Sequence, residues 1–165
     1  MKFFVTCFLY FLTSIPAHSQ FSDIKDSTIS HSSEITFLSI SSQDIYKVIH
    51  YSLKTLKSGD PAIEFILVTE NNKAPKILST SISLEISATK SISLIPYRDS
   101  SYYNADGSLT FITIQIINRN DIAELKMNLV SNLILFENKT DKIKLTGHGK
   151  QSLKKAIHSF FRNYT

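Results

Sequence analysis

A stretch of alternating side chains in the middle of the chain constrains the fold most strongly. Between residues 78 and 87, apolar or β-branched side chains alternate with serine and glutamate. A period of two puts each set on its own face of a strand, so this stretch predicts a long strand with one apolar and one serine-rich face. Residues 62–69 and 109–117 are continuous apolar runs that predict two further strands. We therefore expect a sheet to dominate the fold.

Weaker patterns predict more strands. Residues 33–40 are sufficiently apolar and β-branched for a first strand, and Ile92 and Leu94 prolong the alternating stretch after a short break. Near the C-terminus, residues 133–137 and 142–146 flank a short polar turn, which predicts a hairpin. Residues 96–108 are polar and are expected to form a loop.

Three segments show the apolar spacing of helices. Residues 41–44 resemble a capping box, and Gly59 with Pro61 would end the helix that follows. Residues 118–127 predict a second, short helix. The apolar residues of the first helix would be Ile45, Val48, Ile49, Leu53 and Leu56.

The clearest helical pattern is at the C-terminus, after a break at Gly147-His148-Gly149. Apolar residues follow there at positions i, i+3, i+4, i+7 and i+8, which is typical of an amphipathic helix with one buried face. The residues of this stripe are Leu153, Ala156, Ile157, Phe160 and Phe161.

The mixed order of these elements predicts an α+β fold. It would contain a mixed or mainly antiparallel sheet of about seven strands, about three helices and the C-terminal amphipathic helix. Residues 33–165 are long enough for a single domain with its own core. The polar, serine-rich residues 20–32 are expected to form a flexible N-terminal arm before it.

The first 19 residues have the pattern of a secretory signal peptide. Lys2 supplies a positive charge, residues 3–15 are uncharged and mostly apolar, and Ala17-His18-Ser19 fits a cleavage site before Gln20. The apolar run is too short to span a hydrocarbon core of about 30 Å comfortably. We therefore expect an exported protein, secreted or periplasmic, that is cleaved between Ser19 and Gln20.

Cysteine content excludes several chemistries. The single cysteine, Cys7, lies within the predicted signal peptide, so the mature chain would have no thiol for a disulfide, a zinc ribbon or a nucleophile. The histidines have no paired metal-ligand spacing, and there is no G-x-S-x-G motif. The sequence predicts neither a metal nor a cofactor, and it favours a non-enzymatic role.

The polar loop carries the first candidate contact site. Residues 104–110 copy the middle of a calcium loop, but Tyr102 and Thr113 stand where its end ligands should be, so we expect no calcium site. Aromatic side chains are enriched at protein contacts. We therefore predict a ligand or partner contact at Tyr102, Tyr103, Asn104 and Asp106.

The second candidate is a basic surface on the C-terminal helix. Residues 139–162 contain seven basic residues and one acidic residue. A basic amphipathic helix can lie on an anionic membrane surface or meet an acidic partner, although lysines are also common on a solvated helix face. No stacking motif for nucleic acid accompanies the charge. The residues of this predicted anionic surface site are Lys150, Lys154, Lys155 and Arg162.

These observations favour an exported binding module that recognises a protein or a small ligand. Two alternatives stay open: a small secreted hydrolase whose carboxylate and histidine groups meet only in space, and an envelope-associated protein that contacts anionic surfaces through its C-terminal helix. Sequons at Asn138 and Asn163 would be glycosylated only in a eukaryotic secretory pathway.

Overall fold

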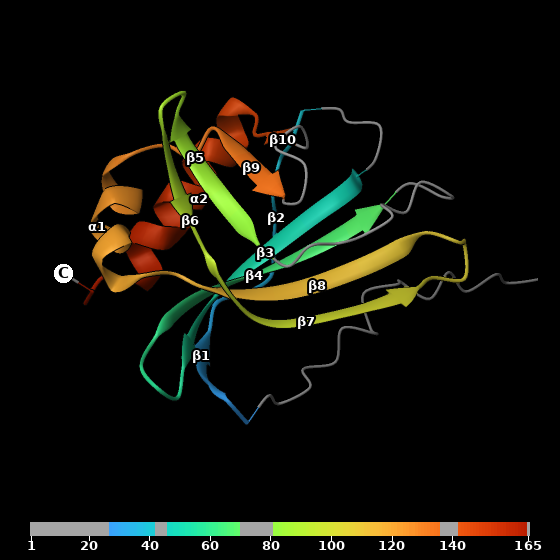
Figure 1. Cartoon of the computed structure of the whole chain (residues 1–165), viewed down its shortest axis with the longest axis horizontal. Helices are drawn as coiled ribbons and strands as arrows, with labels where there is room; N and C mark the ends of the chain where they lie inside the picture. The colour runs from blue at the N-terminus through green and yellow to red at the C-terminus, as the bar shows by residue number, and fades with distance from the viewer. Residues whose placement is uncertain (1–26, 42–45, 70–80, 136–141, 165) are drawn as a thin grey trace, which may run out of the picture.

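A computed structural model describes residues 27–41, 46–69, 81–135 and 142–164. Its larger unit is a six-stranded sheet in which all neighbouring strands are antiparallel (Figure 1). In spatial order the strands are β1 (Ile29–Ser32), β3 (Tyr46–Leu56), β4 (Pro61–Thr69), β8 (Leu109–Ile116) and β7 (Ile95–Tyr103), and β2 (Thr36–Phe37) also pairs with β3.

A smaller antiparallel sheet and two helices lie over one face of the larger sheet. The two helices, α1 (Arg119–Met127) and α2 (Gly147–Phe160), pack against each other at one end of the molecule (Figure 1). The chain passes from the small sheet to the large one at Leu94, between β6 and β7. In spatial order the small sheet contains β10 (Lys142–Lys144), β9 (Asn132–Leu135), β5 (Ile82–Ser87) and β6 (Lys90–Ser93).

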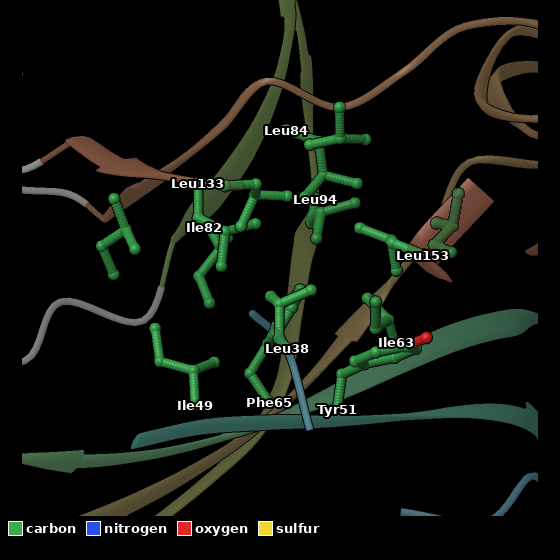
Figure 2. Packing of buried hydrophobic residues seen from close by; sticks show 14 of the residues in the cluster. Leu38, Ile49, Tyr51, Ile63, Phe65, Ile82, Leu84, Leu94, Leu133 and Leu153 are labelled. Atoms are coloured by element: carbon green, nitrogen blue, oxygen red, sulfur yellow. The ribbon is translucent and has the colours of Figure 1, made fainter. Parts of the chain in front are cut away.

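The hydrophobic core lies between these layers, as Figure 2 shows. Alternate residues of β3 and β4 point from the large sheet toward side chains of the small sheet and of α2. Their burial removes apolar surface from water, which is the main stabilising contribution to such a fold. Residues of this core include Ile49, Tyr51, Ile63 and Phe65 from the large sheet, Ile82, Leu84 and Leu133 from the small sheet, and Leu153 from α2.

The helix predicted over residues 45–56 is wrong, because this segment is the strand β3. Its apolar residues fit both periods: Ile49 and Leu53 have helical spacing, but with Tyr51 they also alternate onto the core face of a strand. Pairing with β4 on one side and with β1 and β2 on the other satisfies the backbone, so tertiary context overrides the local pattern. The expected capping residues 42–44 lie outside the described residues.

The loop predicted over residues 96–108 is also wrong in its first part. Residues up to Tyr103 form the edge strand β7, and only residues 104–108 form a turn. An edge strand is exposed and pairs on one side, so it tolerates polar side chains and a proline such as Pro96. The described residues therefore hold ten strands and two helices, instead of about seven and three, within a fold that is α+β as expected.

The strongest sequence patterns are confirmed. The apolar runs form β4 and β8, the predicted hairpin forms β9 and β10, and the two C-terminal helices are α1 and α2. The alternating stretch forms β5 where it is described, but its serine-rich face is not solvated throughout, since Ser83 is buried against Ser93. Of the strand predicted over residues 33–40, only Thr36 and Phe37 form the strand β2, and Ile40 makes an isolated bridge with Leu145.

The N-terminal predictions are only partly covered by the described residues. Ile29–Ser32, the last residues of the predicted arm, form the strand β1. The predicted signal peptide and cleavage site lie outside the described residues, so export remains a prediction.

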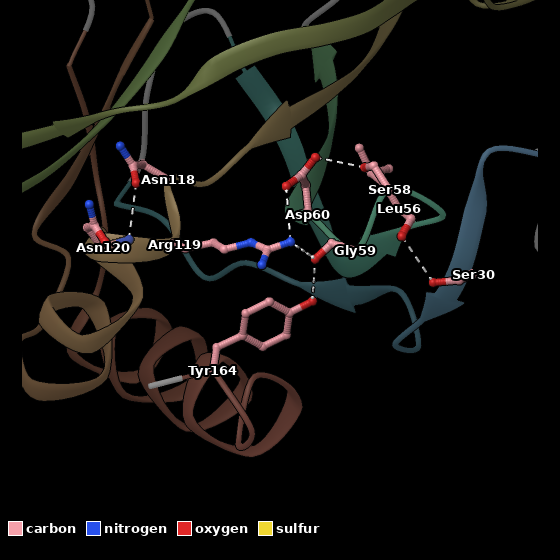
Figure 3. Close-up of polar contacts among 9 residues, drawn as sticks. All are labelled: Ser30, Leu56, Ser58, Gly59, Asp60, Asn118, Arg119, Asn120 and Tyr164. Atoms are coloured by element: carbon pink, nitrogen blue, oxygen red, sulfur yellow. Dashed lines mark hydrogen bonds and ion pairs between the residues drawn. The ribbon is translucent and has the colours of Figure 1, made fainter.

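The turn between β3 and β4 is held by the C-terminal half of the chain, as Figure 3 shows. Gly59, whose φ of 83° suits glycine, accepts two hydrogen bonds through its carbonyl oxygen. Arg119 at the start of α1 donates one at 2.9 Å, and the hydroxyl of Tyr164 donates the other at 3.1 Å. Gly59 therefore lies in a turn between strands and Pro61 begins β4, so the two residues do not end a helix.

Candidate functional site

The edge strand β7 is the most exposed apolar feature of the described residues. Four of its large side chains face solvent, although hydrophobic groups elsewhere are mostly buried. Among the described residues, β7 pairs only with β8, so the backbone groups on its other side point away from the sheet. The exposed fractions are 53% for Ile95, 39% for Tyr97, 45% for Tyr102 and 72% for Tyr103. We call residues 95–103 the β7 edge.

A compact turn joins the β7 edge to β8. Asn104 bonds to Ser108 through its backbone and its side chain, and its amide also donates to the hydroxyl of Thr110 at 2.9 Å. The carboxylate of Asp106 accepts from the hydroxyl of Ser108 at 2.6 Å and from its backbone N–H at 3.0 Å. These two bonds, the hydroxyl first, lower the pKa of the Asp106 carboxyl below its usual range. Gly107, with a φ of 81°, completes the turn.

The four residues predicted for a contact thus lie in one hairpin but have different roles. Tyr102 and Tyr103 end the β7 edge with exposed rings, whereas Asn104 and Asp106 use their polar atoms to build the turn. The sequence prediction missed Tyr97 because it treated residues 96–108 as a loop, and it ended the preceding strand pattern at Leu94, one residue before Ile95. The strand propensity of the Tyr residues, directly after the strand pattern at Leu94, is the signal that could have found them.

The predicted basic site lies along α2. Lys155 and Arg162 are exposed, while Lys150 and Lys154 are half-buried, and Lys154 donates to the backbone carbonyl of Met127 at 2.6 Å. The apolar stripe of the helix is in the core, where Leu153, Ile157 and Phe161 have no exposed surface. Binding of this stripe to a membrane would therefore require the core to open, so any contact with an anionic surface would use the basic side chains alone.

A polar cluster on the outer face of the large sheet has no counterpart in the sequence prediction. Lys54 and Glu64 form an ion pair at 3.2 Å with side chains only 10% and 14% exposed. Ser52 donates to the same Glu64 oxygen at 2.9 Å, and Lys54 donates to the hydroxyl of Ser32 at 3.2 Å. A serine beside a lysine can be a nucleophile and its base. Here, however, the Ser52 hydroxyl donates to Glu64 and not to Lys54, and the contacts of the cluster pair the two buried charges.

The parts of the chain that the structure describes contain no group of three or more histidine, cysteine or acidic side chains that could hold a metal ion. No described helix is long and apolar enough to cross a membrane. Of the histidines, His50 packs edge-on against Phe37, whereas His31, His148 and His158 lie exposed and apart.

Comparison with known proteins gives no relative. No protein-family model matches the chain, and neither a curated protein nor a solved structure shows significant similarity to it.

Proposed function

We propose that this protein is an exported interaction module that binds its partner along the β7 edge. The observation that carries the proposal is the concentration of exposed tyrosine and isoleucine side chains on one strand that, among the described residues, pairs on one side only. Proteins generally protect exposed edge strands with charges, short lengths or coverings, because such strands pair readily with other chains. β7 has part of this protection in Pro96, Arg98 and Asp99, but it is nine residues long and exposes four large apolar or aromatic side chains.

Strand addition gives the physical basis of binding. An extended segment that aligns with β7 would bond to the outward N–H and C=O groups, and these bonds supply affinity without dependence on sequence. The tyrosines would then supply selectivity, because their rings offer a large contact area and a hydroxyl group at low conformational cost. The turn after Tyr103 supports this role by holding the end of the strand in place through Asn104 and Asp106.

The binding role is tested by photo-crosslinking in the cells that produce the protein. A photoreactive phenylalanine analogue replaces Tyr103, which is 72% exposed, and in a matched control it replaces Met127, which is 76% exposed at the end of α1. We expect discrete adducts from position 103 that are absent from position 127. No adduct from position 103, or the same adducts from both positions, would contradict the proposal.

The export part of the proposal rests on the N-terminal pattern and has its own test. The full chain is expressed in a bacterial host, and the mass of the exported product is measured. We expect a chain that starts at Gln20. Retention of the intact chain in the cytoplasm would refute export, and it would leave the assignment of the β7 edge untouched.

A further inference from the structure

We infer that the basic side of α2 binds the surface of an anionic membrane. We call this surface the α2 basic face, and it consists of Lys150, Lys154, Lys155 and Arg162. The inference does not depend on the proposed function, because it concerns other residues than the β7 edge. A protein held to lipid in this way would keep β7 available for its partner.

The charge of the α2 basic face is not neutralised by the described residues. From Lys142 to Tyr164 the chain has six lysine and arginine residues and no acidic residue. None of the four residues of the face forms an ion pair with a described carboxylate, and Lys154 donates to the neutral carbonyl of Met127. The ion pairs of the described residues involve other basic residues, namely Lys54, Lys90, Arg119 and Lys142.

The neighbouring helix α1 does not supply the missing negative charge. Its Glu124 forms an ion pair with Lys90 of β6. Its Asp121 lies in the first turn, where an acidic side chain interacts favourably with the helix dipole. Lys126 of the same helix donates to the backbone carbonyl of Tyr164 and so brings a further cation to the C-terminal end of α2. The packing of the two helices therefore adds to the positive charge of this region.

The exposed residues of α2 lack the side chains that other anionic partners require. Protein interfaces are enriched in aromatic residues and methionine and depleted in lysine, and single-stranded nucleic acid stacks on aromatic rings. None of the large apolar or aromatic side chains that are exposed among the described residues belongs to α2. The exposed residues of the helix are Gly147, His148, Gln151, Lys155, His158 and Ser159.

The arrangement of the charges also fits a surface better than a single small anion. Tight binding of a small anion requires several donors that converge on one point. Lys150, Lys154 and Lys155 lie within α2 and Arg162 just beyond its end, so the charges follow the helix over about three turns. An anionic membrane requires only that basic residues reach it together, and each lysine or arginine then raises the affinity about fivefold.

Vesicle co-sedimentation tests the inference with one loss, one gain and one control. The full chain is mixed with vesicles of phosphatidylcholine alone, or of equal parts phosphatidylglycerol and phosphatidylcholine. Lys155→Glu reverses an exposed charge of the face, and Gln151→Lys adds a charge one turn away on the same side of the helix. Lys47→Glu is the matched control, because Lys47 is also exposed but lies at the start of β3, near Asp106.

We expect the chain to bind the anionic vesicles at least tenfold more tightly than the neutral vesicles in about 0.1 M salt. This difference should vanish in about 1 M salt, where the screening length falls from about 10 Å to about 3 Å. Lys155→Glu should weaken binding to the anionic vesicles at least tenfold, and Gln151→Lys should strengthen it about fivefold. Lys47→Glu should change it less than twofold, although it alters the net charge as much as Lys155→Glu.

Two results would overturn the inference. Equal binding to both kinds of vesicle would show that the charge contributes nothing, and equal effects of Lys155→Glu and Lys47→Glu would show that only the net charge matters. The same variants are also titrated with soluble poly-glutamate. Tighter binding to poly-glutamate than to the anionic vesicles, with the same dependence on Lys155, would assign the α2 basic face to an acidic protein instead of a membrane.

Discussion

Gly149 packs so closely against Ser39 that the effect of Gly149→Ala on stability can be predicted from the geometry. Gly149 lies in the first turn of α2, where a Cβ atom would overlap the carbonyl oxygen of Ser39 and lie 3.1 Å from its carbonyl carbon. Both atoms belong to the backbone, so no side chain can rotate away. The same junction holds Thr146, which caps α2 by accepting from the Gly149 N–H and donates to the Ser39 hydroxyl at 2.8 Å. Gly149→Ala must therefore push the helix away from residues 38–40.

The expected loss in the free energy of unfolding for Gly149→Ala combines three effects. Overpacking of a rigid contact costs about 1–3 kcal/mol. Weakening of the helix cap at Thr146 adds about 1 kcal/mol. Alanine offsets about 1 kcal/mol through its better helix propensity. We expect Gly149→Ala to lower the free energy of unfolding by about 1–3 kcal/mol, since the propensity gain cancels only the loss of the cap.

Gly147 provides the matched control. It occupies the same first turn, but a Cβ atom there would meet nothing within 4 Å. Gly147→Ala should therefore be neutral or stabilising by up to about 1 kcal/mol, since only helix propensity changes. Urea unfolding followed by circular dichroism measures both variants. If Gly149→Ala is as stable as Gly147→Ala, the close approach to Ser39 does not govern packing of α2 and the reasoning is refuted.

Three further predictions address polar contacts. Lys54→Met should lower the free energy of unfolding, measured in urea, by about 3 kcal/mol, because it leaves the Glu64 carboxylate buried without its ion-pair partner. The double variant Lys54→Met/Glu64→Leu removes both charges and should lower the free energy of unfolding by less. A larger loss in the double variant would contradict this. The Asp106 carboxyl, with its lowered pKa, should stabilise the β7–β8 turn above about pH 4, and this contribution should disappear as the pH falls through its folded-state pKa. An NMR titration should give a midpoint below 3.8, and Asp106→Asn should remove the titration. Finally, Tyr164→Phe should lower the free energy of unfolding, measured by thermal melts, by about 1 kcal/mol because it removes the hydrogen bond to Gly59. Tyr164→Ala should lower it clearly more, because the ring also packs edge-on against Phe161 in the core. Equal losses would show that the ring contact contributes nothing.

Prediction from sequence succeeded where one pattern excluded the others. The stripe of α2 matches only the helical period, and its residues Leu153, Ile157 and Phe161 are fully buried as expected. The continuous runs of β4 and β8 are too short and too rich in β-branched residues for helices, and both are strands. Such segments carry their structure locally.

Prediction failed where two patterns overlapped or where no apolar pattern existed. In β3, the spacing of Ile49 and Leu53 fits a helix, and only pairing with strands on both sides selects the extended form. In β7, exposed polar and aromatic residues give no alternation, and the strand exists because β8 offers an edge to pair with. For the candidate site, the sequence indicated Tyr102 and Tyr103 but could not show that they end a strand at the edge of the sheet formed by the described residues.

The sequence by itself determined the α+β class, the C-terminal amphipathic helix and the absence of cysteine from residues 20–165, because composition and periodicity are local properties. Only the tertiary structure decided which segments share a sheet. It also decided which tyrosines stay exposed and why Gly149 must be a glycine beside Ser39. Strand pairing and close backbone approach depend on residues far apart in the chain, so no local pattern encodes them.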